Sequence, residues 1–372
     1  KLTKKKIAII SGTRPEAIKL APVYLALKSR GAKVDYVKTG QHSRLHDQVT
    51  NFFKISHSLK NCVIPKKQRD LSTLCHELIK NLNKLFKQKK YTDIVVQGDT
   101  ASAFCGAHVA FLNKLNIFHV EAGLRTNNLE EPFPEEAFRK LISVYADINF
   151  SPTKSSFKNL INEGIDPKKI FNTGNTVVDS LRIAEKKNLD MKFIRSEIGK
   201  TILNDINANP FVLLTIHRRE NHNKKLDDIC EAIKTFSKKS KTRILCPIHP
   251  NPDVYSKIKK NFFDQNRIHL VKPLSYQSII WVLKKCKFIV SDSGGLQEEA
   301  PSFNKRIVIL RNKTERPEIL KCGLGKISGT NPSKLLKILL ETDRLKQSKK
   351  KLANPFGNGY SANKIIKKIL NY

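Results

Sequence analysis

Several side chains of this sequence stand where proton-transfer chemistry could be carried out. Asp99 and Glu121 follow short apolar runs, and Glu135 and Glu136 follow a proline-rich turn. A carboxyl group shielded from water has a raised pKa and can exchange protons near neutral pH. His217 closes another apolar run, and a histidine beside a phosphate can protonate or stabilise a leaving group. The alternatives are a helix cap or structural ion pair for each carboxylate, and a buried structural role for His217.

Two turns are candidates for binding an anion. Residues 12–14 join an apolar run to a helix expected to begin near Pro15, and residues 293–295 lie between another run and a short helix. A glycine turn lets the backbone approach a ligand, and N–H groups at a helix start attract negative charge. Neither turn is a Walker loop or a dinucleotide fingerprint, although a nucleoside diphosphate conjugate is permitted. Arg316 could pair with the same phosphates; a simple strand-to-helix turn and a surface salt-bridge loop are the alternatives.

A metal site is not expected. His42 and His46 have helical i, i+4 spacing, but the sequence offers no third ligand in a known frame. The seven cysteines include no Cys-x-x-Cys pair, so neither a zinc ribbon nor a disulfide framework is indicated. Reduced, buried thiols are the expectation.

The elements that would position these residues alternate between strands and helices. The expected strands cover residues 7–10, 34–39, 93–97, 117–120, 148–151, 170–173, 211–216, 242–247, 268–271, 288–291 and 307–310. A turn and an amphipathic helix follow most of them, which predicts two parallel, doubly wound sheets. Residues 184–209 are expected to be helical near a domain junction, and residues 361–370 to form an amphipathic helix capped by Ser361.

Polar residues collect directly after the expected strands. Seven such groups occur in the chain, among them residues 98–100, 121–123 and 292–295. In open parallel sheets ligands bind at the carboxyl ends of the strands, near the point where the strand order reverses. Two such edges facing each other would form an interdomain cleft.

Length and charge limit the remaining classes. The chain has 372 residues, which suggests two domains, and a net charge of +36 from 69 basic and 33 acidic residues. A hydrophobic content of 40% excludes a disordered polycation, and the apolar runs are too short to cross a membrane. The N-terminal apolar run is too brief for a secretory signal, so a cytoplasmic location is expected. The lysines are dispersed and no nucleic-acid recognition motif is present, which favours compositional drift over polyanion binding.

The motifs resemble those of the non-hydrolysing UDP-N-acetylglucosamine 2-epimerases. They lie, in family order, at residues 12–22, 98–100, 119–126, 134–136, 173–176, 217–221, 292–301, 314–318 and 354–357. The resemblance implies an α/β fold of two Rossmann-like domains of glycosyltransferase-B type facing across a cleft, with the C-terminal helix packing back on the first domain. The implied domains are residues 1–173 with 356–372, and residues 174–355. Gln97 departs from the family, which commonly has histidine there, and residues 304–306 depart at a turn.

The resemblance also implies roles for individual residues. The catalytic set would be Asp99, Glu121, Glu135 and His217. The substrate and UDP positions would be Arg14, Lys19, Ser293, Gly294, Gly295, Glu299 and Arg316. A second UDP-GlcNAc could act as activator at Gln41, Gln48, Arg218 and His249. No cofactor and no metal are implied, and the family suggests a homodimer.

The implied reaction is 2-epimerisation of UDP-GlcNAc to UDP-ManNAc, by elimination of UDP to 2-acetamidoglucal and re-addition, for surface polysaccharide synthesis. Other reactions on the same fold stay open: hydrolytic release of free ManNAc, epimerisation of a modified UDP-HexNAc, or glycosyl transfer. A polyanion-binding protein is the alternative of a different class.

Overall fold

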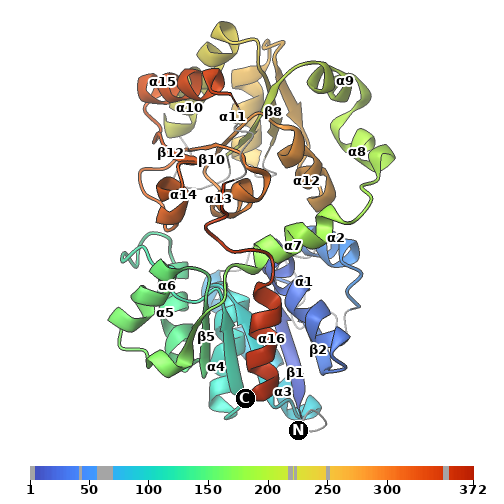
Figure 1. Ribbon diagram of the computed structural model, residues 1–372, viewed down its shortest axis with the longest axis vertical. Helices are drawn as coiled ribbons and strands as arrows, with labels where there is room; N and C mark the ends of the chain where they lie inside the picture. The colour runs from blue at the N-terminus through green and yellow to red at the C-terminus, as the bar shows by residue number, and fades with distance from the viewer. Residues whose placement is uncertain are drawn as a thin grey trace. The chain divides into compact units, whose positions relative to one another are not determined.

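The computed structural model describes residues 5–41, 44–56, 70–216, 221, 224–248, 252–346 and 352–372. The chain divides into two compact units, Lys1–Ile183 with Phe356–Tyr372, and Ala184–Pro355 (Figure 1). The first unit thus runs to Ile183, whereas the expected boundary lay after residue 173. The difference is most of one helix, which packs on the first unit through Ser180, whose hydroxyl donates to the Ile18 carbonyl.

The first unit is built on a parallel sheet in the order β2-β1-β3-β4-β5-β6. Its strands are β1 (Lys6–Ser11), β2 (Lys33–Lys38), β3 (Asp93–Gln97), β4 (Asn116–Val120), β5 (Ile148–Ser151) and β6 (Ile170–Asn172). Its helices are α1 (Arg14–Ser29), α2 (Arg44–Phe52), α3 (Leu71–Lys89), α4 (Ala101–Leu112), α5 (Glu135–Tyr145), α6 (Lys154–Asn162), α7 (Thr176–Glu185) and α16 (Ser361–Asn371). Every residue of β3 is buried, as expected of a central parallel strand covered by helices on both faces.

The second unit holds a parallel sheet in the order β12-β11-β10-β7-β8-β9. Its strands are β7 (Phe211–Thr215), β8 (Arg243–Pro247), β9 (Ile268–Val271), β10 (Ile289–Ser291), β11 (Ile307–Ile309) and β12 (Gly325–Ile327). Its helices are α8 (Met191–Ile198), α9 (Lys200–Ala208), α10 (Lys224–Lys239), α11 (Pro252–Phe262), α12 (Tyr276–Lys285), α13 (Gly294–Glu299), α14 (Pro317–Lys321) and α15 (Pro332–Arg344). None of the helices within the described ranges has the length and apolar character of a membrane span.

The predicted fold class and all eleven predicted strands are confirmed, within a residue or two at their ends. The twelfth strand, β12, was not predicted, because three residues that include Gly325 and Lys326 at a sheet edge give no apolar run. The predicted helical stretch at residues 184–209 is confirmed as α8 and α9, which are separated by Gly199 with a φ of 91°.

The strand order reverses once in each sheet. In the first unit β1 and β3 are neighbours, so the turns after Ser11 and Gln97 leave the same sheet edge side by side. In the second unit β7 and β10 are neighbours, and the turn at residues 292–295 leaves there. These are the switch points at which parallel sheets bind ligands.

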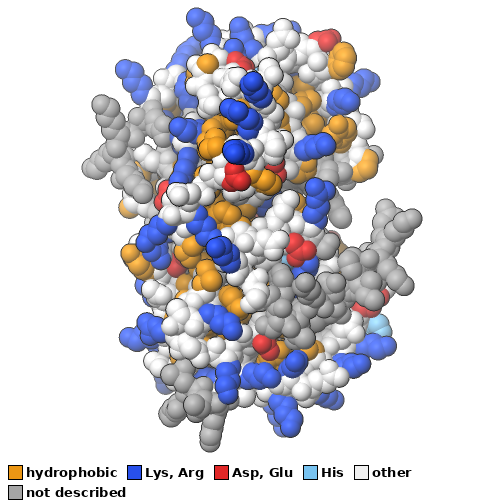
Figure 2. Space-filling view, turned by 90° about the vertical axis from the view of Figure 1, so that its right-hand side faces the viewer, with side chains coloured by type: hydrophobic (Ala, Val, Ile, Leu, Met, Phe, Trp, Pro, Cys, Tyr) orange, Lys and Arg blue, Asp and Glu red, His pale blue; other side chains and the backbone are white. Residues whose placement is uncertain are grey.

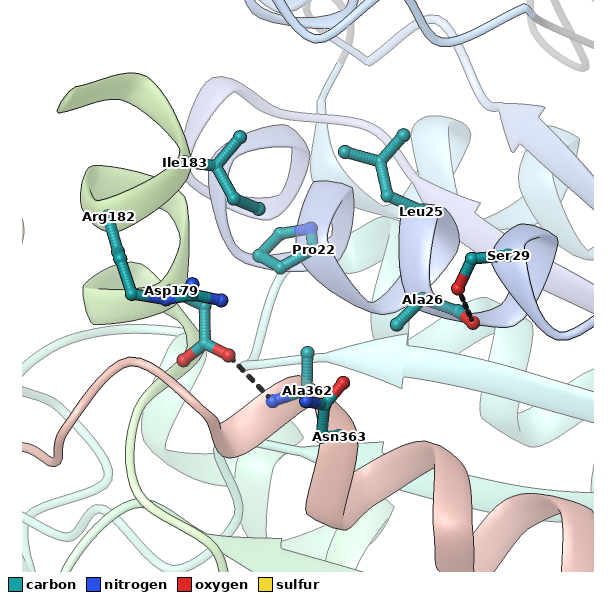
Figure 3. Close-up of a pocket in the computed structure, with 9 residues that line it drawn as sticks. All are labelled: Pro22, Leu25, Ala26, Ser29, Asp179, Arg182, Ile183, Ala362 and Asn363. Atoms are coloured by element: carbon teal, nitrogen blue, oxygen red, sulfur yellow. Dashed lines mark hydrogen bonds between the residues drawn. The ribbon is translucent and has the colours of Figure 1, made fainter. Parts of the chain in front are cut away.

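Helix α16 packs back on the first unit, as predicted, and it lies there against α1 (Figure 1). Its predicted cap is wrong: Tyr360 is the N-cap residue, and the carboxylate that accepts the first N–H groups belongs to Asp179 of α7. Asp179 accepts from the backbone of Ser361 at 3.1 Å and of Ala362 at 2.9 Å. Figure 3 shows the contact between Asp179 and Ala362 beside a pocket that α1, α7 and α16 line. A buried carboxylate is a stronger acceptor than a serine hydroxyl and favours the positive end of the helix dipole.

Candidate active site

Glu121 lies directly after β4, and three donors surround its carboxylate. Its Oε2 forms an ion pair with Lys19 Nζ and accepts from Asn175 Nδ2 at 3.1 Å. Its Oε1 accepts from Gln97 Nε2 at 3.1 Å. The Glu121 and Lys19 side chains are only 8% and 6% exposed. Because a buried carboxylate is costly unless it is paired and hydrogen-bonded, this set of donors stabilises the ionised group.

The backbone of Glu121 is unusual for a residue with a side chain. Its φ is 65°, in the left-handed region that costs a non-glycine residue of order 1–3 kcal/mol. Such conformations persist where the surroundings fix them, and they cluster at functional sites. The described contacts with Lys19, Gln97 and Asn175 contribute to holding the side chain of Glu121 in this position.

Asp99 lies near the same sheet edge and is paired with an arginine of α5. Arg139 Nε donates to Asp99 Oδ2 at 3.0 Å, and the Arg139 Nη2 contacts the same oxygen. The preceding Gly98 has a φ of 71°, and its carbonyl lies 2.8 Å from His119 Nε2. Burial lowers the pKa of His119 to about 4, so the ring is neutral at pH 7 and donates its Nε2–H to that carbonyl. The turn that carries Asp99 is therefore held from β4.

The two neighbouring glutamates at the start of α5 have separate roles. Glu136 is fully buried and accepts from the backbone N–H groups of Thr126 and Asn127 at 3.0 to 3.1 Å. It also pairs with Arg139 at 3.2 Å. Glu136 therefore has the structural role named as the alternative for these carboxylates, since it forms an ion pair and holds backbone N–H groups. Glu135 lies half-buried in the first turn of α5.

In the turn after β1, a side chain of the following helix α1 occupies the backbone N–H groups. The Glu16 carboxylate accepts from Gly12 N at 3.1 Å, from Thr13 N at 2.7 Å and from Thr13 Oγ1 at 2.8 Å. Thr100 donates to its second oxygen at 2.8 Å. Two N–H groups considered for anion binding are thus occupied, and Gly12 is required for packing, since a Cβ there would lie 2.1 Å from the Ser102 Oγ. Arg14, at the first position of α1, is half-buried.

Glu16 is a buried acid that the sequence did not single out. Burial raises the pKa of its carboxyl group to about 7, against the opposing effect of its hydrogen bonds. The Thr-x-x-Glu pattern of a capping box was the available signal. Its bond to Thr100 joins the turn after β1 to the turn after β3.

In the second unit, the turn after β10 combines a glycine backbone with an arginine. The Ser293 side chain accepts from Leu296 N at 3.4 Å, and Gly294 lies under the Arg316 guanidinium, 2.7 Å from where a Cβ would be. Arg316 Nε donates to Glu298 at 2.6 Å, and its Nη1 lies 3.4 Å from Glu315. The structure therefore brings Ser293, Gly294, Gly295 and Arg316 together, with Glu299 buried on the same helix. The arginine carries a carboxylate partner on each side.

The candidate activator residues are only partly described. Gln41 Oε1 accepts from Ser102 N at 3.2 Å and from Ser102 Oγ at 2.7 Å. Gln48 lies on α2, and its buried Oε1 has no hydrogen-bond partner among the described residues. His217, Arg218 and His249 lie outside the described residues. So does His42, whereas His46 Nε2 lies 2.9 Å from Ser11 Oγ in the core.

Three residues that contact the candidate carboxylates were not predicted to belong to the site. Gln97 and Asn175 hold Glu121, and Arg139 holds Asp99. Gln97 ends a strand and Asn175 lies in a Gly-Asn-Thr turn, which are weak signals. Arg139 carried no signal, because it lies inside a helix 40 residues from its partner.

Two doubly wound parallel sheets, with paired carboxylates at the carboxyl edge of one and a glycine turn beside an arginine at the switch point of the other, define an α/β enzyme of glycosyltransferase-B type. The sequence matches the UDP-N-acetylglucosamine 2-epimerase family over residues 25–370. The chain belongs to this family.

Individual relatives agree over almost their whole lengths. The UDP-N-acetylglucosamine 2-epimerase of Campylobacter jejuni is 38% identical over 97% of this chain and 96% of its own. That of Bacillus subtilis is 35% identical over 99% and 96%. Among solved structures, the Neisseria meningitidis UDP-GlcNAc 2-epimerase bound to UDP-GlcNAc has a TM-score of 0.92 and 34% identity, covering 99% of this chain and 100% of the other. The Methanocaldococcus jannaschii enzyme in complex with UDP-GlcNAc and UDP has a TM-score of 0.86 and 31% identity, with the same coverage.

Proposed function

We propose that the protein interconverts UDP-GlcNAc and UDP-ManNAc by eliminating UDP and adding it back to 2-acetamidoglucal. The observation that carries this proposal is the Glu121 carboxylate, held by Lys19, Gln97 and Asn175 at the switch-point edge that also presents Asp99. Family membership and relatives whose structures hold UDP-GlcNAc and UDP support the choice of substrate.

The chemistry requires more than one acid/base group. The C2 hydrogen of the sugar is not beside a carbonyl, so it becomes acidic only when the C1–O bond to UDP breaks and positive charge develops at C1. Inversion then requires a proton to leave one face of C2 and a proton to return on the other. Asp99, Glu121 and Glu135 are the groups we assign to these transfers, and His217 is assigned to the departing diphosphate.

The departing UDP carries negative charge that donors must stabilise. We assign this to Arg14, Lys19 and Arg316, and to the turn at Ser293, Gly294 and Gly295, with Glu299 as a further substrate contact. Lys19 has a second task in this assignment, because its ammonium group already pairs with Glu121. Re-addition of the same UDP completes the reversible reaction, whose product would supply surface polysaccharide synthesis from the cytoplasm.

We assign a regulatory site for a second UDP-GlcNAc to Gln41, Gln48, Arg218 and His249. The buried Gln48 carbonyl oxygen supports this assignment, since it has no partner within the described part of the chain and a bound hydroxyl or amide could donate to it.

We also propose that the protein is a homodimer. The end of α4 and the outer face of α5 expose Phe111 by 53%, Leu112 by 63%, Leu141 by 41% and Val144 by 68%. Helices α4 and α5 are in contact, and exposed apolar side chains gathered on neighbouring helices are typical of a protein–protein interface.

Proton NMR of the protein with UDP-GlcNAc tests the reaction. The expected result is an equilibrium mixture with UDP-ManNAc. Free ManNAc would favour hydrolysis, transfer to an added acceptor would favour a glycosyltransferase, and turnover of a modified UDP-HexNAc alone would change the substrate.

The net charge of +36 does not lead us to a second function. Lys and Arg side chains are scattered over the face seen in Figure 2 rather than gathered in one band. Salt-sensitive nucleic-acid binding together with no turnover of any UDP-sugar would contradict this conclusion.

A further inference from the structure

We propose that Gln97 and Asn175 are positioning residues that keep the Glu121 carboxylate ionised and fixed in orientation. This inference rests on the proposed function, in which Glu121 exchanges a proton with the substrate. It assigns to two neutral amides a part in holding this carboxylate beside its ion pair with Lys19.

The contacts are divided between the two carboxylate oxygens. Gln97 Nε2 donates to Oε1 at 3.1 Å, while Asn175 Nδ2 donates to Oε2 at 3.1 Å beside the Lys19 ammonium group. Lys19 pairs with Oε2, the oxygen that Asn175 also contacts, whereas Gln97 contacts Oε1. Donors on both oxygens fix the plane of the carboxylate and favour the charged form over the protonated one.

Amides suit this task because they carry no net charge and do not titrate. A second ammonium group or an imidazolium would also favour the ionised carboxylate, but it would add a competing proton donor beside the reacting group. Two amides stabilise the charge while Glu121 remains the group that takes the proton.

Gln97 is held in place by the sheet. It is the last residue of β3, is 3% exposed, and pairs in register with Val120, the residue before Glu121. The backbone N–H of the following residue, Gly98, donates to the Val120 carbonyl at 3.0 Å. The strand ladder therefore fixes the backbone positions from which the Gln97 amide and the Glu121 carboxylate meet.

Asn175 is held in place by a different part of the chain. Its backbone N–H donates to the Phe356 carbonyl at 2.7 Å, and its Oδ1 accepts from Val177 N at 3.0 Å. With Oδ1 committed to the start of α7, the Nδ2 group is directed at Glu121. Asn175 is 2% exposed.

Other charged groups lie on the elements around Glu121. They include Arg14, Glu16 and Lys19 on α1, Asp99 after β3, His119 on β4, Arg125 in the loop after β4, and Glu135, Glu136 and Arg139 on α5. Asp99 is paired with Arg139, Glu16 is bonded to its own turn, and Lys19 pairs with Glu121. A change at Gln97 or Asn175 leaves these pairs in place.

Titration of the Glu121 carboxyl carbon tests the inference without requiring turnover. Protein labelled with ¹³C at the glutamate side-chain carboxyl is followed by NMR against pH, and the Glu121 signal is identified by its absence in Glu121→Gln. Gln97→Met keeps the shape of the side chain but removes the donor. Asn175→Asp keeps the acceptor for Val177 N but replaces the donor with a like charge.

We expect the titration midpoint to rise by about one pH unit in Gln97→Met, a tenfold change in proton affinity, and by more in Asn175→Asp. The control is Asn159→Asp. Asn159 lies on α6 and donates at 2.9 Å to the carbonyl of Gly123, which is in the same loop as Glu121, and none of its described contacts is with Glu121. An unchanged midpoint in both variants, or an equal rise in the control, would overturn the inference.

The two proposals fail in different ways. If wild-type protein does not epimerise UDP-GlcNAc, the proposed function is wrong, while the carboxyl titration still decides the role of the amides. If the wild type is active, the acid limb of its rate profile should move to higher pH in the variants by the same amount as the titration midpoint.

Discussion

The backbone N–H of Asn175 donates to the carbonyl of Phe356 at 2.7 Å, which joins two segments far apart in the sequence. The Asn175 side chain in turn donates to Glu121. Two hydrogen bonds, both made by Asn175, therefore connect the returning C-terminal segment to the proposed acid/base group. The segment is therefore part of the framework of the site as well as a cover for helix α1.

Gly174 makes that junction possible, and its replacement should damage the site. Gly174 has a φ of 90°, and a Cβ there would lie 2.6 Å from the Ser361 Oγ and 3.2 Å from the Phe356 carbonyl oxygen. We expect Gly174→Ala to lower the free energy of unfolding by about 1–3 kcal/mol and to lower turnover at least tenfold. Thermal unfolding and the rate of epimerisation measure the two effects.

Gly31→Ala is the matched control for this substitution. Gly31 has a φ of 72°, but nothing lies within 4 Å of its added Cβ. The Gly31→Ala substitution should lower the free energy of unfolding only by the strain of the left-handed backbone, and it should leave turnover unchanged. Equal losses in both variants would show that crowding at the junction has no role.

Arg139 should matter to catalysis through Asp99. Arg139→Met removes the ion pair at 3.0 Å from Asp99 and leaves the buried Glu136 without its arginine. We expect kcat to fall by about one to two orders of magnitude, because Asp99 loses its orientation and its compensating charge. Steady-state kinetics test this, with Arg243→Met as a control, since Arg243 pairs with Asp205 in the second unit. A loss only in KM would contradict a role in positioning Asp99.

The stability of the protein should depend on pH through Glu16. The pKa of its carboxyl group is raised from 4.5 to about 7 by burial, so the folded state binds the proton more tightly than the unfolded chain. The stabilising contribution is complete below about pH 4.5 and is lost as the pH rises to about 7.

Glu16→Gln should remove that dependence. Between pH 4.5 and 7 the free energy of unfolding of the variant should rise relative to wild type by on the order of 3 kcal/mol. Hydrogen bonds lost in the variant add a constant, and other groups such as His119 titrate alike in both proteins. Denaturant unfolding at several pH values measures the difference, and a difference independent of pH would refute the assignment.

The proposed homodimer should separate when charge is placed on its apolar face. Val144 is 68% exposed on α5, so Val144→Asp should leave the fold of the subunit intact. We expect sedimentation to give a dimer for wild type and a monomer for the variant, because burying an unpaired carboxylate is costly. Lys158→Asp on α6, outside this face, is the control. A wild-type monomer would remove the proposal.

Much of the fold could be predicted, because parallel strands buried on both faces leave runs of β-branched residues that are visible in the sequence. Asp99 and Glu121 could be placed at one sheet edge for the same reason. Their partners could not: Gln97 contacts Glu121 through strand register, and Asn175 does so through a turn fixed by Phe356. The turn at residues 12–14 was predicted to bind an anion, because a glycine turn before a helix is typical of such sites. The Thr-x-x-Glu pattern of Thr13 and Glu16 also predicts a capping box, in which the Glu16 carboxylate takes these N–H groups.

The central claim is that acid/base side chains of the first unit exchange the hydrogen at C2 of a UDP-sugar. The most direct measurement is proton NMR of UDP-GlcNAc incubated with the protein in D₂O. We predict deuterium at C2 of the epimerised product with wild type, and a rate of exchange lower by orders of magnitude in folded Asp99→Asn and Glu121→Gln. Epimerisation without deuterium at C2, or wild-type exchange in both variants, would contradict the account.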